Sequence, residues 1–303
     1  MPAELIRNGV KVDDTFAEAF GMRATAIVIT ADTAEWAHRA AVTMTGFATS
    51  VIACGCEAGI DRMLDASETP DARPGVRVLL FAVSTGMLQE QLQARLGQCV
   101  LTCAGTACYA GIDGEEKLKL GAAIRYFGDG WQVSKLLGGK RYWRIPVMDG
   151  ECVVEETTGL TKEAVGGGNL LIMGRDRLST LAASEAAVKA VAAVPDVIMP
   201  FPGGIVRSGS KVGSKYKALS ASTNEAYCPT LKGRVASALS PDIGSVLEIV
   251  IDGLTDAAVH AGMRAGLHAV CERGAAEGVV RVGAGNYGGK LGKFQYRLAE
   301  LLG

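Results

Sequence analysis

The chain has 303 residues, a formal net charge of −1 and 49% hydrophobic residues. This composition excludes a disordered or fibrous protein, and the length favours two domains. Lysine and arginine are scattered along the chain, so nothing indicates a nucleic-acid-binding surface. The chain has no apolar run of about 18 residues and begins without a signal pattern, which predicts a cytoplasmic protein that does not enter a membrane.

The first half of the chain alternates strand-like and helix-like segments. Residues 26–30 (AIVIT) predict a buried strand, and Asp32 and Thr33 then provide an N-cap for a helix over residues 34–44. A second helix is predicted over residues 85–96, because Gly97 ends its pattern. Short apolar runs predict further strands at residues 51–53, 76–83, 99–102, 118–127 and 141–147.

The second half repeats this order of elements. Gly166, Gly167 and Gly168 predict a bend before a strand at residues 169–173. An alanine-rich helix over residues 177–194 is closed by Pro195, and a second helix over residues 256–273 ends at Gly274. The remaining strands are predicted at residues 197–199, 246–251 and 279–282.

Each half thus contains two strand–helix–strand units in the same order. This pattern predicts an α/β (α+β) protein with two related ferredoxin-like split βαβ lobes, each with helices on one face of its sheet. The parallel order indicates an internal duplication. The turn-rich segment 148–150 predicts the boundary, with an N-terminal lobe at residues 1–149 and a C-terminal lobe at residues 150–303.

The eight cysteines and three histidines do not have the spacing of a metal site. One residue separates Cys54 from Cys56 and three separate Cys99 from Cys103, whereas zinc sites use paired C-x-x-C motifs. We therefore expect no metal, and reduced thiols that pack mostly as small hydrophobic residues. A nucleophilic Cys99 or Cys103 is the alternative, although no nearby histidine would lower its pKa.

Two glycine-rich loops in the second half carry lysine or hydroxyl groups. One spans residues 286–292 (NYGGKLG), and the other spans residues 201–204 (FPGG) with 208–211 (SGSK) after it. Glycine lets a backbone approach a ligand closely, and lysine supplies a charge for a carboxylate or phosphate. The loops predict a site for a long, anionic small molecule. Dinucleotide-binding and phosphate-loop motifs are absent, so a nucleotide cofactor has no support.

Other polar residues lie in segments whose role the pattern leaves open. Glu248 lies inside the apolar run 246–251, either on an exposed strand face or as a partly buried carboxylate with a raised pKa, suited to proton transfer. Glu18 follows Asp14 in a segment that is either a helix capped by Asp14 or the wall of a pocket. Residues 223–233 form a loop rich in hydrogen-bond donors.

Several long and unusual motifs are distributed over nearly the full length of the chain. They are residues 14–20 (DTFAEAF), 45–47 (TGF), 57–60 (EAGI), 95–103 (RLGQCVLTC), 127–130 (FGDG), 200–206 (PFPGGIV), 208–213 (SGSKVG), 228–233 (CPTLKG), 248–253 (EIVIDG) and 286–292 (NYGGKLG). On these motifs the chain closely resembles the formylmethanofuran–tetrahydromethanopterin formyltransferase family.

The resemblance implies two related lobes, a homotetramer and no permanently bound cofactor. Methanofuran and tetrahydromethanopterin would be co-substrates, and a formyl group would pass between the amine of the first and N5 of the second. In methylotrophic bacteria, similar chains are one subunit of a formyltransferase/hydrolase complex, so other subunits are expected partners. A non-catalytic subunit that binds the carriers and organises this complex is the alternative function. The near-neutral charge and residues 138–144 (GGKRYWR) depart from acidic archaeal members and favour a bacterial form.

The resemblance also implies roles for the candidate residues in a direct acyl transfer. Glu248 is expected to handle the proton, and a thioformyl intermediate on Cys99 or Cys103 is the rival mechanism. Oxyanion donors are expected from Asn286 and from the backbone amides of Gly203, Gly204, Gly288 and Gly289. Lys211, Lys232 and Lys290 would bind the anionic tails of the carriers. Further binding candidates are Thr15, Glu18, Ser208, Ser210, Thr230 and Tyr287.

Overall fold

The apolar runs of the first half form a seven-stranded sheet in the computed structural model, which describes residues 5–303. The strand order is β5-β6-β4-β7-β11-β10-β9, and Ile27, Val78 and Leu80 are fully buried in its core. Its strands are β4 (Arg23–Thr30), β5 (Glu57–Leu64), β6 (Gly75–Ala82), β7 (Ala107–Ala110), β9 (Val133–Leu137), β10 (Lys140–Val147) and β11 (Gly150–Glu155). Two short strands, β8 (Lys117–Lys119) and β12 (Thr157–Gly159), pair with each other.

Two helices share one hydrophobic core with this sheet. Helix α1 (Ala34–Thr45) begins where Thr33 Oγ1 accepts the N–H of Trp36, and α3 (Thr85–Arg95) begins at a similar cap on Ser84. Their buried faces carry small and branched apolar residues such as Met44 and Leu88. The shorter helical segments are α2 (Val51–Cys54), η1 (Ala66–Glu68), the π-helical turn η2 (Leu96–Val100), α4 (Gly121–Ile124) and η3 (Arg125–Gly128).

The second half builds an eight-stranded sheet around the long strand β13. The order is β1-β2-β18-β13-β17-β14, and β3 pairs with both β13 and β19. Helices α5 (Arg177–Val191) and α6 (Asp256–Arg273) pack on each other and on the sheet. The other elements are β1 (Leu5–Arg7), β2 (Val10–Val12), β3 (Phe16–Gly21), β13 (Val165–Gly174), β14 (Val197–Ile198), β17 (Ser245–Gly253), η7 (Ala275–Glu277), β18 (Val279–Gly283), β19 (Phe294–Arg297) and α7 (Leu298–Leu302).

Both sheets contain the same four-stranded core. In the first sheet the order is β7-β4-β6-β5, and in the second it is β18-β13-β17-β14. In each core the first strand lies between the fourth and the third, and helices connect the first strand to the second and the third to the fourth. This is the ferredoxin-like split βαβ topology, so the predicted fold class is confirmed.

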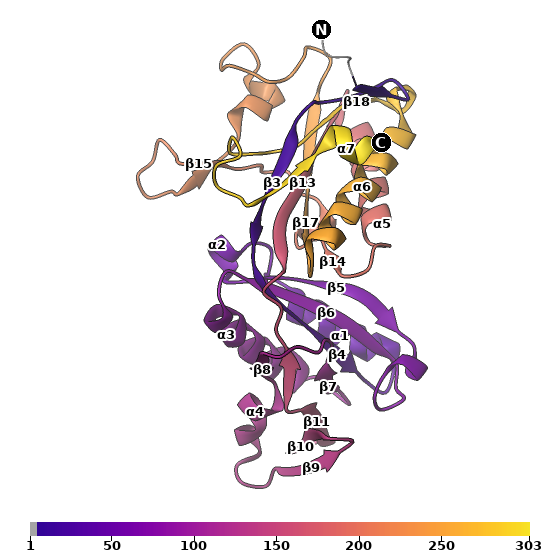
Figure 1. Cartoon of the computed structure of the whole chain (residues 1–303), viewed down its shortest axis with the longest axis vertical. Helices are drawn as coiled ribbons and strands as arrows, with labels where there is room; N and C mark the ends of the chain where they lie inside the picture. The colour runs from indigo at the N-terminus through magenta and orange to yellow at the C-terminus, as the bar shows by residue number, and fades with distance from the viewer. Residues whose placement is uncertain (1–4) are drawn as a thin grey trace.

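The first strands of the chain belong to the second sheet. Strand β2 lies parallel to β18, and β3 pairs with β13 and β19. The chain then crosses to the other sheet at Met22 and begins β4 at Arg23. Figure 1 shows β3 in indigo beside the much later strand β13. The division at residues 149 and 150 into two lobes stays a prediction, and the pairing makes residues 5–21 partners of the C-terminal sheet.

Equivalent connections in the two cores differ greatly in length. The β5–β6 connection covers residues 65–74 and contains only η1. The β14–β17 connection covers residues 199–244 and contains the hairpin of β15 and β16, which projects to the left in Figure 1. The elements of the long connection are η4 (Pro202–Gly204), β15 (Lys211–Val212), β16 (Ala221–Ser222), η5 (Glu225–Tyr227) and η6 (Pro229–Leu231).

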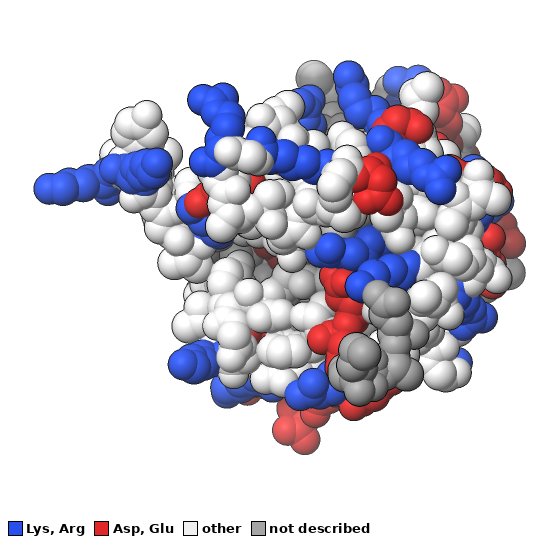
Figure 2. Space-filling view, turned by 90° about the horizontal axis from the view of Figure 1, so that it is seen from above, with Lys and Arg blue, Asp and Glu red and all other residues white. Residues whose placement is uncertain are grey.

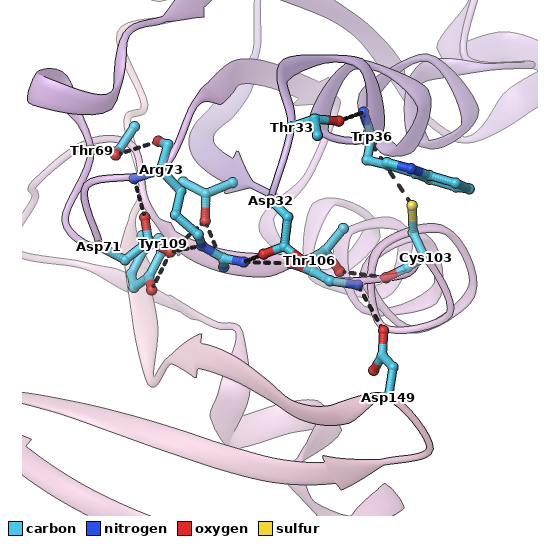
Figure 3. A network of polar contacts seen from close by, with 12 residues as sticks. Asp32, Thr33, Trp36, Thr69, Asp71, Arg73, Cys103, Thr106, Tyr109 and Asp149 are labelled. Carbon is cyan, nitrogen blue, oxygen red and sulfur yellow. Dashed lines mark hydrogen bonds and ion pairs between the residues drawn. The ribbon is translucent and has the colours of Figure 1, made fainter.

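A polar network centred on Arg73 fastens the short connection (Figure 3). The Arg73 guanidinium donates to Asp71 (2.8 Å), Asp32 (2.9 Å) and the carbonyl of Gly105 (2.6 Å). Asp71 also accepts the hydroxyl groups of Thr30 and Tyr109. The network therefore joins the loop before β6 to β4, β7 and the start of α1.

The two sheets meet at an apolar junction that also contains an ion pair. Residues from β4, β6 and β14 form one buried cluster there, and Ile198 packs where a Cβ on Gly59 would stand. Arg77 on β6 donates to Asp61 and to Asp196, each at 2.6 Å, and so links the two halves. The close packing leaves the edge strands β5 and β14 next to each other.

Three strand predictions in the first half are wrong. Residues 51–53 form helix α2 instead of a strand, because Ser50 caps the amide of Ile52. Residues 99–102 belong to and follow the π-helical turn that extends α3. Within residues 118–127 the strand ends at Lys119, and α4 and η3 follow. A run of a few apolar residues fits a buried helix turn as well as a strand.

The glycine run and the Asp14 segment also differ from their predictions. Gly166 and its neighbours lie inside β13, where the pairing with β17 shifts between Val165 and Gly168. Gly167 has φ +93°, which an L side chain rarely adopts. The residues after Asp14 form strand β3, so the capped helix is wrong. Among residues 5–303, no helix is long and apolar enough to cross a membrane.

Candidate functional site

A cavity of about 480 Å³ lies between the C-terminal sheet and the long 199–244 connection. Figure 2 looks at this end of the molecule and shows a hollowed surface beside the projecting arm at left, which carries lysine side chains. The N-terminal half contributes residues of α2 and Glu57 to the same wall. The cavity therefore draws on both halves of the chain.

The floor of the cavity is built from alternate residues of two paired strands. On β17 these are Val246, Glu248 and Val250, and on β13 they are Gly167, Asn169 and Leu171. Glu248 pairs directly with Leu171 across the strands. Successive side chains of a strand point to opposite faces, so one face of both strands supplies most of the floor, to which Leu247 also contributes. The apolar run 246–251 thus packs into the core through Ile249 and Ile251 and lines the cavity through the alternate residues.

Glu248 is a half-buried carboxyl group among apolar neighbours. Burial alone raises its pKa to about 7, because desolvation disfavours the charged form. Within the described part of the chain no side chain or amide donates to its carboxylate. Glu248 and Glu18 also help to raise the pKa of Tyr287, after burial itself, which places that phenol near both carboxyl groups. A carboxyl group of this kind exchanges a proton easily near neutral pH.

Glu18 also borders the cavity, but its carboxylate holds a loop of the protein. It accepts the backbone N–H groups of Tyr287 and Gly289 on one oxygen and those of Leu291 and Gly292 on the other, at 2.6–2.9 Å. Burial raises the pKa of Glu18, and the four donors together outweigh this and lower it to about 2. Glu18 is therefore a constant negative charge that shapes the 286–292 loop. Of the two alternatives for the segment after Asp14, the wall of a pocket agrees with this position.

The 286–292 loop presents its side chains rather than its amides to the cavity. The side-chain amide of Asn286 donates to Thr15 and the Phe16 carbonyl and accepts the N–H of Gly288. The amides of Gly288 and Gly289 are thus occupied, and the oxyanion role predicted for them does not fit this geometry. Asn286 and Tyr287 line the cavity, whereas Lys290 is exposed outside the lining.

A polar and basic wall stands opposite this loop. Ser208, Ser210 and Lys211 line the cavity, as predicted for anion-binding groups, and Arg207 joins them. Lys211 forms an ion pair with Glu225, and its hydrogen bond is the main reason that the pKa of the Glu225 carboxyl group is lowered. The wall offers hydroxyl groups and two cationic side chains to a negatively charged tail.

Other predicted residues lie away from the cavity. The Lys232 ammonium donates to the carbonyls of Pro241 and Ile243 and so fastens the long connection. Gly204 packs against Val188 at φ +76°, and its amide donates to Phe201. The remaining predicted residues outside the lining are Thr15, Gly203 and Thr230. Thr15 contacts the site indirectly, through Asn286.

The sequence interpretation missed a pair of buried carboxyl groups at the inner end of the cavity. Glu57 lines the cavity, and Asp252 is fully buried, where burial and then the nearby Glu57 raise the pKa of its carboxyl group. The signal was present, because Glu248, Val250 and Asp252 alternate along β17 and therefore share one face. Other lining residues that were missed are Phe20, Asn169, Arg207, Asn224 and Tyr227.

The cysteines lie outside the Glu248 environment, apart from Cys228. Cys99 and Cys103 border a separate recess beside α1, and burial raises the pKa of both thiols. Cys228 is at the cavity edge, where its sulfur contacts Thr223 and Asn224. In residues 5–303 no group of three His, Cys, Asp or Glu side chains is placed to hold a metal ion.

Comparisons with protein families and curated proteins cover the whole length of the chain. Residues 5–147 match a family model described as formylmethanofuran-tetrahydromethanopterin formyltransferase, and residues 150–301 match one described as the proximal lobe of the same enzyme. A formylmethanofuran–tetrahydromethanopterin formyltransferase of Methylococcus capsulatus is 62% identical over 98% of this chain and 100% of its own. Its counterpart from Methanosarcina acetivorans is 46% identical over 97% of this chain and 99% of its own.

Solved structures give the same relationship. The chain is similar to one in the crystal structure of the formyltransferase/hydrolase complex of Methylorubrum extorquens with methylofuran, with a TM-score of 0.97 and 59% identity over 99% of both chains. It is also similar to the Methanosarcina barkeri formylmethanofuran:tetrahydromethanopterin formyltransferase, with a TM-score of 0.93 and 44% identity over 98% of this chain and 100% of that one.

Proposed function

Because the chain belongs to the formylmethanofuran–tetrahydromethanopterin formyltransferase family, we propose that it moves a formyl group between methanofuran and N5 of tetrahydromethanopterin. The observation that carries this proposal is Glu248, a carboxyl group with a pKa of about 7 in the floor of a large cavity. Such a group supplies or accepts the proton that an acyl transfer between two nitrogens must move.

Glu248 acts in its neutral form on the carbonyl oxygen of the formyl group. The acceptor nitrogen attacks the formyl carbon, a new C–N bond forms, and the carbonyl oxygen becomes an oxyanion. The acid proton of Glu248 stabilises this oxygen, and each well-placed donor lowers a barrier by roughly 3–4 kcal/mol. The old C–N bond then breaks as the C=O bond re-forms, and Glu248 relays the proton of the attacking amine to the leaving nitrogen. Val246 and Val250 flank Glu248 on the same face of β17 and line the same cavity.

The opposite wall binds the charged parts of the carriers. Arg207 and Lys211 supply positive charge, and Ser208 and Ser210 supply hydroxyl donors in the same lining. Lys211 exchanges its Glu225 partner for an anionic tail of the carrier. A lysine–anion contact of this kind is charge-assisted, so it contributes mainly to carrier affinity. The carriers serve as co-substrates, and direct transfer needs no permanently bound cofactor.

The thioformyl alternative has little geometric support. A nucleophilic thiol would have to lie beside Glu248, but Cys99 and Cys103 border another recess and have raised pKa values. A thiol with a raised pKa is a poor nucleophile at neutral pH, because little thiolate is present. The C99S/C103S double variant is therefore expected to retain full activity, and loss of activity with an unchanged fold would restore the thiol mechanism.

We also propose that the chain works in an assembly in the cytoplasm. A relative from Methylorubrum extorquens is named as one of the subunits of a formyltransferase/hydrolase complex and is 61% identical over 97% of this chain. Exposed apolar side chains around the β9 hairpin, such as Trp131 (81% exposed) and Leu136 (61%), would be covered in a homotetramer or by other subunits. A non-catalytic role in organising such a complex is the second candidate function, and light scattering of the pure chain measures its own oligomeric state.

Formyl exchange followed by mass spectrometry tests the proposed function. The purified chain is mixed with formyl-methanofuran and tetrahydromethanopterin in the absence of any other protein. Formyl-tetrahydromethanopterin should accumulate, and the E248Q variant should slow its formation. Carrier binding without transfer would favour the organising role, and the absence of both in folded protein would contradict the proposal.

A further inference from the structure

The buried carboxyl groups of Glu57 and Asp252 connect two cavity-lining segments from different halves of the chain. Glu57 is the first residue of β5, and one of its oxygens accepts the N–H of Val51 in α2 at 3.1 Å. Asp252 lies on β17, and its Oδ1 accepts the N–H of Gly167 in the β13 bulge at 3.0 Å. Residues of α2 form a wall of the cavity and Gly167 belongs to its floor.

The environment of the pair requires a proton between the two carboxyl groups. Asp252 is fully buried and Glu57 is 9% exposed, and the second oxygen of Asp252 has no hydrogen-bond partner among residues 5–303. Two adjacent carboxylates without a cation repel each other and cannot both remain ionised in such a site. Burial, and then the charge of Glu57, raise the pKa of Asp252 well above its usual range.

Charged groups on the surrounding elements do not neutralise the negative charge of Glu57 and Asp252. Arg77 is occupied by Asp61 and Asp196, and Glu18 is occupied by the 286–292 loop. In the described residues, none of the neighbouring titratable groups donates to Glu57 or Asp252. Those groups are Cys54 and Cys56 beside Glu57, Glu18 on β3, Asp61 on β5, Arg77 on β6, Asp196 before β14, Glu248 on β17, and Asp256 and His260 on α6.

We infer that Glu57 and Asp252 share one proton and act together as a positioning pair, which holds the α2 wall of the cavity against its β13 floor. The chain of contacts runs from the Val51 amide through the two carboxyl groups to the Gly167 amide. This inference deepens the proposed function, because the spacing of wall and floor sets how a carrier lies over Glu248. Neither carboxyl group needs to touch the reacting atoms.

Amide substitutions replace the shared proton without removing the contact. In D252N the amide oxygen can still accept from Gly167 while the NH₂ group donates to Glu57, and E57Q offers the corresponding arrangement toward Val51. D252A breaks the connection and leaves Glu57 buried without a partner. We expect D252N to retain near wild-type kcat and KM, whereas D252A should raise the KM of a carrier about tenfold with a smaller change in kcat.

Infrared spectroscopy detects the shared proton directly. The C=O stretch of a neutral carboxyl group should be present in the wild type at about pH 8.5, where Glu248 with its pKa of about 7 is mostly ionised. The same band should be absent from D252N. The exposed Asp113 provides a matched control, since D113N should leave the band and the kinetics unchanged.

The pH dependence of stability is a second readout that does not need catalysis. Above the usual range of aspartate, the unfolded chain releases a proton that the folded chain keeps at Asp252, so the free energy of unfolding falls as the pH rises. D252N should flatten this slope. A missing carboxyl band in the wild type, an equal slope in D252N, or a wild-type KM in D252A would overturn the inference. If formyl transfer itself fails, the band and the slope still decide whether the proton is shared.

Discussion

The β5–β6 and β14–β17 connections occupy the same place in two copies of one topology, yet the first has a structural role and the second lines a cavity. The first, residues 65–74, is short and tied down by Arg73. The second, residues 199–244, spreads into a hairpin and a basic wall, and it encloses a cavity over β13 and β17. In one topology that occurs twice, the candidate site lies beside the long connection, while the short connection is fastened to its own sheet.

Substitution of Glu248 should have the largest effect, because it removes the acid proton from the floor of the cavity that the long connection helps to enclose. We expect E248Q to lower kcat by about 100- to 1,000-fold with a small change in carrier KM. The wild-type kcat/KM should fall as the pH rises through about 7, since the neutral form of Glu248 is lost there.

The E248Q profile should lack this fall, and the exposed E185Q variant on α5 should behave as the wild type. Initial rates of formyl exchange between pH 5.5 and 9 measure both effects. A kcat for E248Q within about twofold of the wild type would remove Glu248 from the mechanism.

Substitution of Glu18 tests whether the 286–292 loop is as important as the long connection. E18Q cannot accept four backbone donors, because its NH₂ group faces N–H groups that need an acceptor. We expect kcat/KM to fall by about 100-fold, since small displacements of a site are this costly.

Hydrogen exchange at residues 287–292 should become faster in E18Q but not in the exposed control E163Q. The pKa of Glu18 is about 2, so the carboxylate keeps the loop in place until the pH falls toward that value. Slow exchange in E18Q together with low activity would mean that Glu18 acts on the substrate instead.

A smaller effect is expected at the basic wall of the long connection. K211A removes one cation from the cavity lining, so the KM of the carrier with the anionic tail should rise about tenfold at nearly constant kcat. Added salt should weaken carrier binding to the wild type more than binding to K211A. Steady-state kinetics at two ionic strengths, with the exposed K189A variant as control, distinguish this role from a purely structural one.

The short connection should affect stability and leave catalysis unchanged. R73A removes the donors of Asp71, Asp32 and the Gly105 carbonyl, and we expect the free energy of unfolding to fall by about 2 kcal/mol (Figure 3). R73K keeps the charge but loses the planar fork, so it should recover only part of the loss. Urea unfolding measures the free energy of unfolding of each variant. At urea concentrations below the unfolding transition, kcat and KM should equal those of the wild type. Altered kinetics would show that the two connections are coupled.

The sequence predicted the repeated topology because long periodic segments are reliable signals. The helix over residues 256–273 and the strand at 246–251 appear almost as expected, as α6 and β17. The runs at 51–53 and 99–102 failed, since a run of a few apolar residues does not distinguish a strand from a helical turn. Local pattern also could not place β3, whose partners lie more than a hundred residues away.

The candidate site was predicted in part for a related reason. Glu248, Lys211 and Tyr287 line the cavity. They were candidates because charged or ring-bearing groups next to glycine-rich or apolar runs indicate a site. Lys232 and the Gly288 amide carry the same signals, but protein groups occupy them. Asp252 went unnoticed because its role depends on Glu57, and only the tertiary structure brings these two residues together.

The pairing of residues 5–21 with the C-terminal sheet sets an order for biosynthesis. Strand β3 leaves the ribosome early, but its partners β13 and β19 are synthesised only after residue 164. The N-terminal sheet can fold during translation, while β2 and β3 wait for the strands of the second sheet with which they pair. A nascent chain stalled before β13 would therefore expose unpaired strands, the form most open to aggregation or to a chaperone.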